Sequence, residues 1–172
     1  MATAPVAAVA EKADRDKPMH IEADALTHDD LKQVSIFKGR AVLVKGTLIL
    51  RGDRIEIRED PDGYQSGLIF SESGKRAFFR QKREGANEYI EAEGQRIEYD
   101  GKRDVVTILD KGEVRRYRGT TLTDQMMGQR IVYENLSDVF SIDGQRPDAS
   151  GSTTGGRVRA TLVPKDKTEV RK

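Results

Sequence analysis

The chain has 172 residues, of which 36% are hydrophobic and 34% are charged, so it can build only a thin core between sheets that keep one face in water. Its 30 Lys and Arg residues nearly balance its 29 Asp and Glu residues, which argues against a nucleic-acid-binding protein. Two His and no Cys argue against a transition-metal site and against thiol chemistry.

The first 17 residues are expected to form a flexible leader, because they are small or charged and show no periodicity. Their start lacks the basic segment of a signal peptide, so we interpret it as the front of an exported chain whose signal peptide has been removed. No apolar run in the sequence reaches the length of a membrane span.

Short alternating segments with turn signals between them follow from Pro18 onward. They recur every ~8–12 residues, which is typical of an all-β sandwich or barrel. The predicted strands are 19–23, 34–37, 41–45, 47–51, 54–58, 68–71, 77–81, 89–93, 96–99, 105–109, 113–117, 120–127, 130–133 and 139–142. Only residues 29–33 are expected to form a short helical piece. Residues 147–156 are predicted to be a linker, 157–163 a late, isolated strand, and 165–172 a charged tail.

One phrase occurs three times, at 52–57, 94–99 and 128–133. It consists of Gly, a polar residue, Arg, Ile, any residue, and then Ile or Tyr. We interpret each copy as a turn followed by a strand, and stacked units of this kind bury an apolar stripe together.

The polar residues form no pattern that indicates a catalytic or metal-binding site. Glu56 and Glu98 lie between inward positions and are expected to face solvent rather than act as an acid–base pair. His20 and His28 have no third ligand nearby, and neither a nucleophile elbow nor a phosphate loop occurs. We therefore predict no catalytic residue, no metal and no cofactor.

The apolar face of the predicted strands has two interpretations. It is either an ordinary sandwich core or a groove that accepts apolar chains such as acyl tails. The residues on this face are Ile21, Phe37, Leu43, Ile55, Ile57, Ile69, Phe79, Ile97, Tyr99, Ile108, Ile131, Tyr133 and Phe140.

The first and last strands, 19–23 and 157–163, are the expected sheet edges. An exposed edge can add another strand, so pairing between the two edges of different copies would produce head-to-tail filaments.

Several stretches together resemble the OstA-like lipopolysaccharide-transport proteins. They are PMHIEAD at 18–24, FKGRAVLVKGTLIL at 37–50, AFFRQ at 77–81, the repeated Gly-x-Arg-Ile-x-Tyr units, and the terminal strand within 156–164. The resemblance covers residues 18–164, which are therefore expected to be one domain.

The resemblance implies an all-β, open, slightly twisted antiparallel β-jelly roll of about 14–16 short strands. It further implies a non-enzymatic periplasmic carrier that binds the lipid A part of lipopolysaccharide between its sheets. Its implied partners are an inner-membrane-anchored jelly-roll protein, the outer-membrane translocon, and further copies joined head to tail. The edge residues implied are Met19, His20, Ile21, Glu22, Arg157, Val158, Arg159 and Leu162.

The implied lipid groove contains Met19, Phe79 and Tyr99, and the inward pattern adds Ile21, Phe37, Ile55, Ile57, Ile97, Ile131 and Tyr133. Three cations, Arg76, Arg80 and Lys82, are predicted to meet lipid phosphates at its rim by charge-assisted hydrogen bonds. The alternative is a self-associating β-jelly-roll scaffold protein without a lipid ligand.

Overall fold

The computed structural model describes residues 14–72, 75–83, 87–147, 150 and 153–164. Within these residues no helix is long and apolar enough to cross a membrane. The regular structure described is a series of fourteen strands: β1 (His20–Glu22), β2 (Ala25–Asp29), β3 (Val34–Lys45), β4 (Leu48–Glu59), β5 (Gln65–Phe70), β6 (Ala77–Lys82), β7 (Glu88–Gly94), β8 (Arg96–Asp100), β9 (Val105–Arg118), β10 (Thr121–Glu134), β11 (Val139–Asp143), β12 (Gln145–Pro147), β13 (Thr153–Gly155) and β14 (Arg159–Leu162).

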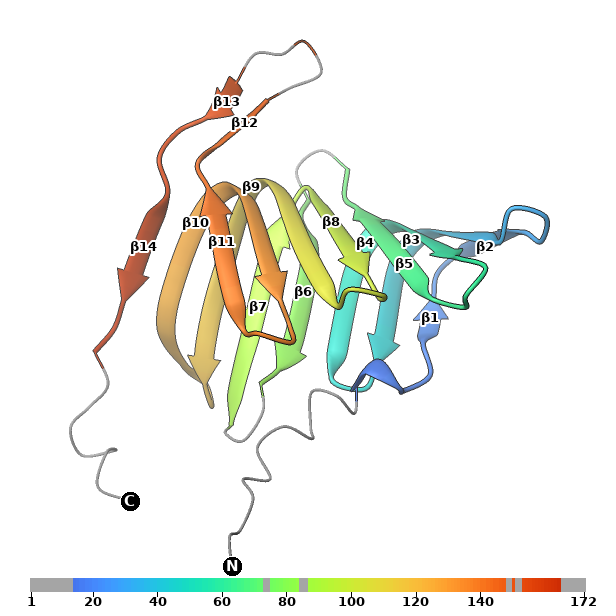
Figure 1. The fold of residues 1–172 in the computed structure, drawn as a ribbon, viewed down its shortest axis with the longest axis horizontal. Helices are drawn as coiled ribbons and strands as arrows, with labels where there is room; N and C mark the ends of the chain where they lie inside the picture. The colour runs from blue at the N-terminus through green and yellow to red at the C-terminus, as the bar shows by residue number, and fades with distance from the viewer. Residues whose placement is uncertain (1–13, 73–74, 84–86, 148–149, 151–152, 165–172) are drawn as a thin grey trace, which may run out of the picture.

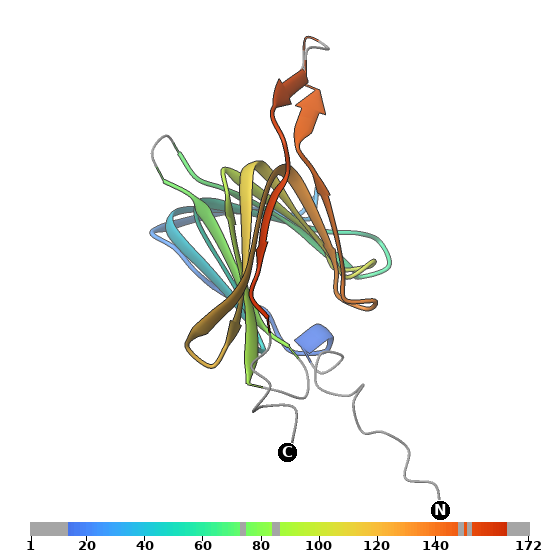
Figure 2. The ribbon, with the colours of Figure 1, turned by 90° about the vertical axis from the view of Figure 1, so that its left-hand side faces the viewer.

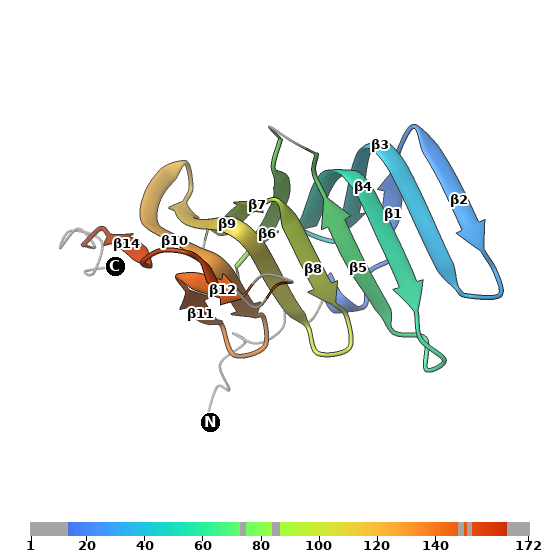
Figure 3. The ribbon, with the colours of Figure 1, turned by 90° about the horizontal axis from the view of Figure 1, so that it is seen from above.

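The strands form two layers, and the long strands β3, β4, β9 and β10 each run from one layer into the other (Figure 1, Figure 2). Layer A contains β2, β5, β8, β11, the first halves of β3 and β9, and the second halves of β4 and β10. Layer B contains β1, β6, β7, β14 and the other halves of the long strands. Figure 3 shows the strands stacked along one axis, from β1 and β2 to β11 and β14. The predicted open antiparallel jelly roll is therefore confirmed.

The long strands pass from one layer to the other along a line that we call the spine. The opposite side, where the hairpin loops of both layers lie, is the open side. The glycine of each repeated phrase stands at the spine. A Cβ at Gly52 would lie 2.6 Å from the Phe70 carbonyl oxygen, and one at Gly128 would lie 2.5 Å from Ile142 Cγ2. Glycine is required because the backbones approach too closely for a side chain.

The predicted breaks at the spine are corners within continuous strands, so several predicted strands merge. Residues 34–37 and 41–45 belong to β3, 47–51 and 54–58 to β4, 105–109 and 113–117 to β9, and 120–127 and 130–133 to β10. Pairing continues across each corner with a shift in register, such as the one between Gly128 and Arg130. The turn signal at Lys111 instead bends β9, where Asp110 and Lys111 have φ angles of 64° and 57°.

Three further predictions are corrected. Residues 29–33 are not helical: they comprise the end of β2 and a turn, and β2 was missed because its one large apolar side chain, Leu26, is exposed. The predicted linker 147–156 contains part of a hairpin, in which β12 pairs with β13. The late strand is not isolated, since β14 pairs with residues 124–127 of β10. The predicted tail, 165–172, lies outside the described residues.

The core lies between the layers and follows from strand alternation. Residues that face the other layer, such as Leu43, Ile55, Ile69 and Ile108, are almost completely buried. Their neighbours along each strand face outward and are largely polar. The predicted inward face is confirmed, because side chains alternate between faces with a period of two.

Candidate functional site

The most prominent feature of the interior is a continuous apolar column between the layers. At one end of the stack Met19, Ile21 and Phe37 are only partly buried against it. At the other end the half-buried residues include Met126 and Phe140. The column is therefore packed along its length and partly exposed at both ends.

The predicted groove residues are brought together in this column. Ile55, Ile57, Phe79, Ile97, Tyr99, Ile131 and Tyr133 are buried, while Met19, Ile21 and Phe37 pack against them at the end. An aromatic series leads toward the opposite end: the ring centroids of Phe79 and Tyr133 are 6.4 Å apart, and Tyr133 stacks on Phe140 at 4.4 Å. Contact of these residues with lipid remains a prediction.

The predicted phosphate rim is not assembled. Ala77, Phe79 and Gln81 are the buried residues of β6, so alternation directs Arg80 and Lys82 outward. Arg80 lies 4.5 Å from the Tyr89 ring centroid and 3.8 Å from a Glu91 oxygen on the outer face. Arg76 stands at the spine and donates to the backbone carbonyls of Glu93 and Lys111. The three cations therefore do not form a cluster beside the interior, and their contact with lipid phosphates remains a prediction.

Charged side chains do reach the interior, but elsewhere. Arg116 pairs across β9 and β7 with Ile90, a buried residue, and so lies on the inner face of layer B. Its guanidinium is 3.1 Å from Asp124 and lies 5.9 Å from the Phe140 ring centroid. The inward position of Arg116 could have been predicted from the sequence, because it lies two residues after Val114, a buried residue of the same strand.

A second charged group joins the layers across the open side. Glu88 of layer B binds Arg118 at 3.2 Å and Arg83 at 3.4 Å. Arg83 also forms an ion pair with Asp138, in the loop between β10 and β11 of layer A. Asp138 in turn accepts a hydrogen bond of 3.0 Å from the Tyr133 hydroxyl.

The N-terminal segment 14–17, which we call the strap, also spans the open side (Figure 2). Asp14 is buried and accepts hydrogen bonds from Thr47 and Gln81 of layer B. Arg15 donates to the Lys102 carbonyl of layer A at 3.1 Å. Asp14, near the end of the predicted flexible leader, is therefore held by contacts with the domain, while residues 1–13 lie outside the described residues. The contacts of Asp14 join residues far apart in sequence, so no local pattern indicates them.

Burial shifts the pKa of two ionisable side chains beside the strap. Burial lowers the pKa of Lys45, an effect opposed by the nearby carboxylates of Asp104, Asp16 and Asp14. Burial also raises the pKa of Tyr99 to about 12. Both side chains lie where the apolar column meets the open side, at the ends of β3 and β8.

The edges of both layers are formed by short strands. Within the described residues, β1 pairs only with β3 and β14 only with β10, which confirms that the two predicted segments are edges. β1 contains His20, Ile21 and Glu22, with Met19 just before it. β14 contains Arg159 and Leu162, with Arg157 and Val158 just before it. Layer A has its own edges, β2 and β11, which the sequence did not indicate. Head-to-tail pairing itself remains a prediction.

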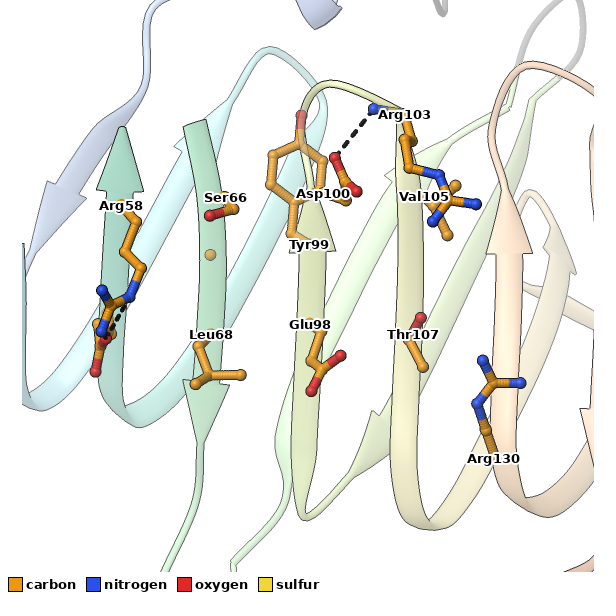
Figure 4. Close-up of a pocket in the computed structure, with 12 residues that line it drawn as sticks. Arg58, Ser66, Leu68, Glu98, Tyr99, Asp100, Arg103, Val105, Thr107 and Arg130 are labelled. Carbon is orange, nitrogen blue, oxygen red and sulfur yellow. Dashed lines mark hydrogen bonds and ion pairs between the residues drawn. The ribbon is translucent and has the colours of Figure 1, made fainter. Parts of the chain in front are cut away.

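A shallow pocket on the outer face of layer A is lined by both charged and uncharged residues (Figure 4). Arg58 binds Glu56 at 2.8 Å, and the Asp100 carboxylate accepts a 3.0 Å bond from the Arg103 backbone N–H. Glu98 binds Arg96 at 2.7 Å. The outward orientation predicted for Glu56 and Glu98 is confirmed, and each glutamate is paired with an arginine two residues away on the same face of its own strand.

Comparison with known proteins places this geometry in context. The model of the family described as LptA/(LptD N-terminal domain) LPS transport protein matches residues 20–139. The chain is 25% identical over 162 residues to the lipopolysaccharide export system protein LptH of Pseudomonas aeruginosa, covering 94% of this chain and 88% of LptH. It is 25% identical over 146 residues to the lipopolysaccharide export system protein LptA of Escherichia coli, covering 83% and 75% of the two chains.

The crystal structure of LptH, described as the LptA homologous periplasmic component of the lipopolysaccharide transport device of Pseudomonas aeruginosa, has a similar fold. Its TM-score is 0.75 at 21% sequence identity, over 88% of this chain and 99% of LptH.

Proposed function

The chain belongs to the LptA/(LptD N-terminal domain) family of LPS transport proteins, and from this premise we propose that it is a periplasmic carrier which binds lipid A between its layers. Its relatives LptH and LptA are lipopolysaccharide export system proteins. The proposed role is not enzymatic: the carrier passes lipopolysaccharide from an inner-membrane-anchored jelly-roll partner toward the outer-membrane translocon.

The observation that carries this proposal is the separation of apolar and charged groups inside the molecule. The apolar column runs through the stack, whereas Lys45, Arg83 and Arg116 stand on the open side of layer B. Each acyl CH₂ gains about 0.8 kcal/mol on burial, so several acyl chains need a long apolar surface. An amphiphile satisfies both regions with its chains inside and its head at the open side.

Lipid entry requires the layers to part, because a packed interior leaves no room for acyl chains. At the spine, four continuous strands join the layers. At the open side the described connections include side-chain contacts, namely the ion pair of Arg83 with Asp138 and the bond from Arg15 to Lys102. Separation therefore begins at the open side, with the spine as the hinge.

Photocrosslinking to lipopolysaccharide tests the location of the lipid. A photoreactive phenylalanine analogue is placed at Phe37 or Phe140, at the two ends of the column, and at Phe78 on the outer face as a matched control. We expect crosslinks from both interior positions and none from Phe78. Equal crosslinking at Phe78, or none from the interior, would favour the scaffold protein without a lipid ligand.

Edge pairing in head-to-tail oligomers can be tested on β14. The Val163 N–H donates to the Thr123 carbonyl of β10 at 3.0 Å. Because N–H direction alternates along a strand, the N–H groups of Ala160 and Leu162 point to the free edge. Leu162→Pro removes a free donor without removing a bond to β10. Sedimentation should show fewer oligomers for Leu162→Pro than for Leu162→Thr, and equal oligomerisation would contradict edge pairing through β14.

A further inference from the structure

The Asp14 carboxylate occupies a site built from hydrogen-bond donors. The Thr47 backbone N–H donates to Oδ1 at 2.9 Å, the Thr47 hydroxyl donates to Oδ2, and Gln81 Nε2 donates to Oδ2 at 3.3 Å. Gly46 has a φ of 58°, and a Cβ there would overlap Asp14 Oδ1. The turn between β3 and β4 is thus shaped to receive an oxyanion.

This donor set lies where the apolar column ends at the open side. Gln81 follows Phe79 on the inner face of β6, and Lys45 follows Leu43 on the inner face of β3. Lys45 is close enough to Asp14 for their charges to interact. A head group bound here would therefore have its acyl chains directed along the column.

The site contains hydrogen-bonding groups that Asp14 does not satisfy. Gln81 is 6% exposed, and its buried Oε1 has no hydrogen-bond partner among the described residues. A buried unpaired acceptor is costly, and a hydroxyl donor would satisfy it. Two backbone or hydroxyl donors, an amide donor, an ammonium group and a free acceptor match a phosphate carried by a hydroxylated sugar. A phosphate also carries more negative charge than a carboxylate and so gains more from Lys45.

We propose that Thr47, Gln81 and Lys45 form the binding site for a phosphate of the glycolipid head, and that Asp14 is the internal anion which this phosphate replaces. The strap releases layer B when Asp14 leaves, so head-group binding and opening of the layers are one event. This inference rests on the proposed function. It differs from the predicted rim at Arg76, Arg80 and Lys82, because here the donors face the interior.

The test compares lipid A with chemically dephosphorylated lipid A by equilibrium binding to the full chain. In Asp14→Ala the donors lose their internal anion, so the preference for the phosphorylated lipid should rise about tenfold, within the usual range of coupling between sites. Asp24→Ala is the matched control, since it removes a carboxylate from the spine that is paired with Arg40. Adding Thr47→Val to Asp14→Ala should return the preference toward the wild-type value.

A second readout keeps the test informative if Asp14→Ala lowers stability. Asp14→Asn retains the side-chain volume and should shift the preference in the same direction. In either variant the Thr47 amide resonance should move when phosphorylated lipid is added and stay in place with dephosphorylated lipid. Inorganic phosphate should compete only weakly; if it saturates the site and lipid A does not displace it, the assignment to a lipid head is overturned.

The outcomes separate this inference from the proposed function. If wild type binds both lipids and Asp14→Ala leaves their ratio unchanged, the phosphate site is refuted while the carrier function stands. If wild type binds neither lipid, both proposals fail.

Discussion

Replacing Phe79 with Ala decides whether the interior is a packed core or a preformed slot. Phe79 is 1% exposed, pairs with Leu50 and Ala92 across its neighbouring strands, and contacts the Tyr133 ring. Removing a phenylalanine from such a site costs about 3–5 kcal/mol of unfolding free energy, through lost burial and the cavity that remains.

The adjacent residue supplies a matched control. Phe78 has the same side chain on the outer face, where the Arg51 guanidinium lies 4.1 Å from its ring centroid. A cation–π contact of this kind contributes about 0.5–1 kcal/mol, so Phe78→Ala should cost roughly 1 kcal/mol. The two variants should thus differ by about 2–4 kcal/mol.

Urea unfolding followed by circular dichroism measures this difference. With a slope of about 1–3 kcal/mol per molar urea, Phe79→Ala should unfold at a urea concentration lower by about 0.7–4 M than Phe78→Ala, with the slope unchanged. A gap below about 1 kcal/mol would refute the packed interior, because it would mean that Phe79 loses little contact on truncation.

Three further outcomes are expected. The folded-state pKa of Tyr99, about 12, exceeds the usual tyrosine value of about 10. The free energy of unfolding should therefore be unaffected below about pH 10 and fall by up to about 3 kcal/mol as the pH rises through about 12. In Tyr99→Phe, urea unfolding measured over the same pH range should not show this loss. Gly128→Ala should lower stability by about 1–3 kcal/mol, whereas Gly156→Ala, with nothing within 4 Å, should be neutral in thermal melts. A double-mutant cycle on Arg83 and Asp138 should give a coupling of about 1 kcal/mol, and zero coupling would argue against a bridge across the open side.

The family resemblance acquires a physical basis in these contacts. Thr47 and Gln81 belong to two of the stretches that carry it, and both are bound to the same carboxylate. Phe79 lies in the same stretch as Gln81 and meets Tyr133, which belongs to a repeated Gly-x-Arg-Ile-x-Tyr unit, in the core. The matching stretches therefore contribute residues both to the apolar column and to the polar closure of its open side.

The sequence by itself determined which residues face inward, as Ile55, Ile57, Ile97 and Tyr99 illustrate, because alternation in a strand is a local property with a period of two. It could not distinguish a turn at Gly52 from a corner, since both need a glycine, and only the neighbouring strand reveals the close approach.

Tertiary structure alone decided how the interior is closed. Asp14 bonds to Thr47 and Gln81 across 33 and 67 residues, and Arg83 meets Asp138 only because two layers face each other. Such pairings depend on strand order and on loop positions in space. No local periodicity encodes them, because each partner alone resembles an ordinary solvated polar or charged residue.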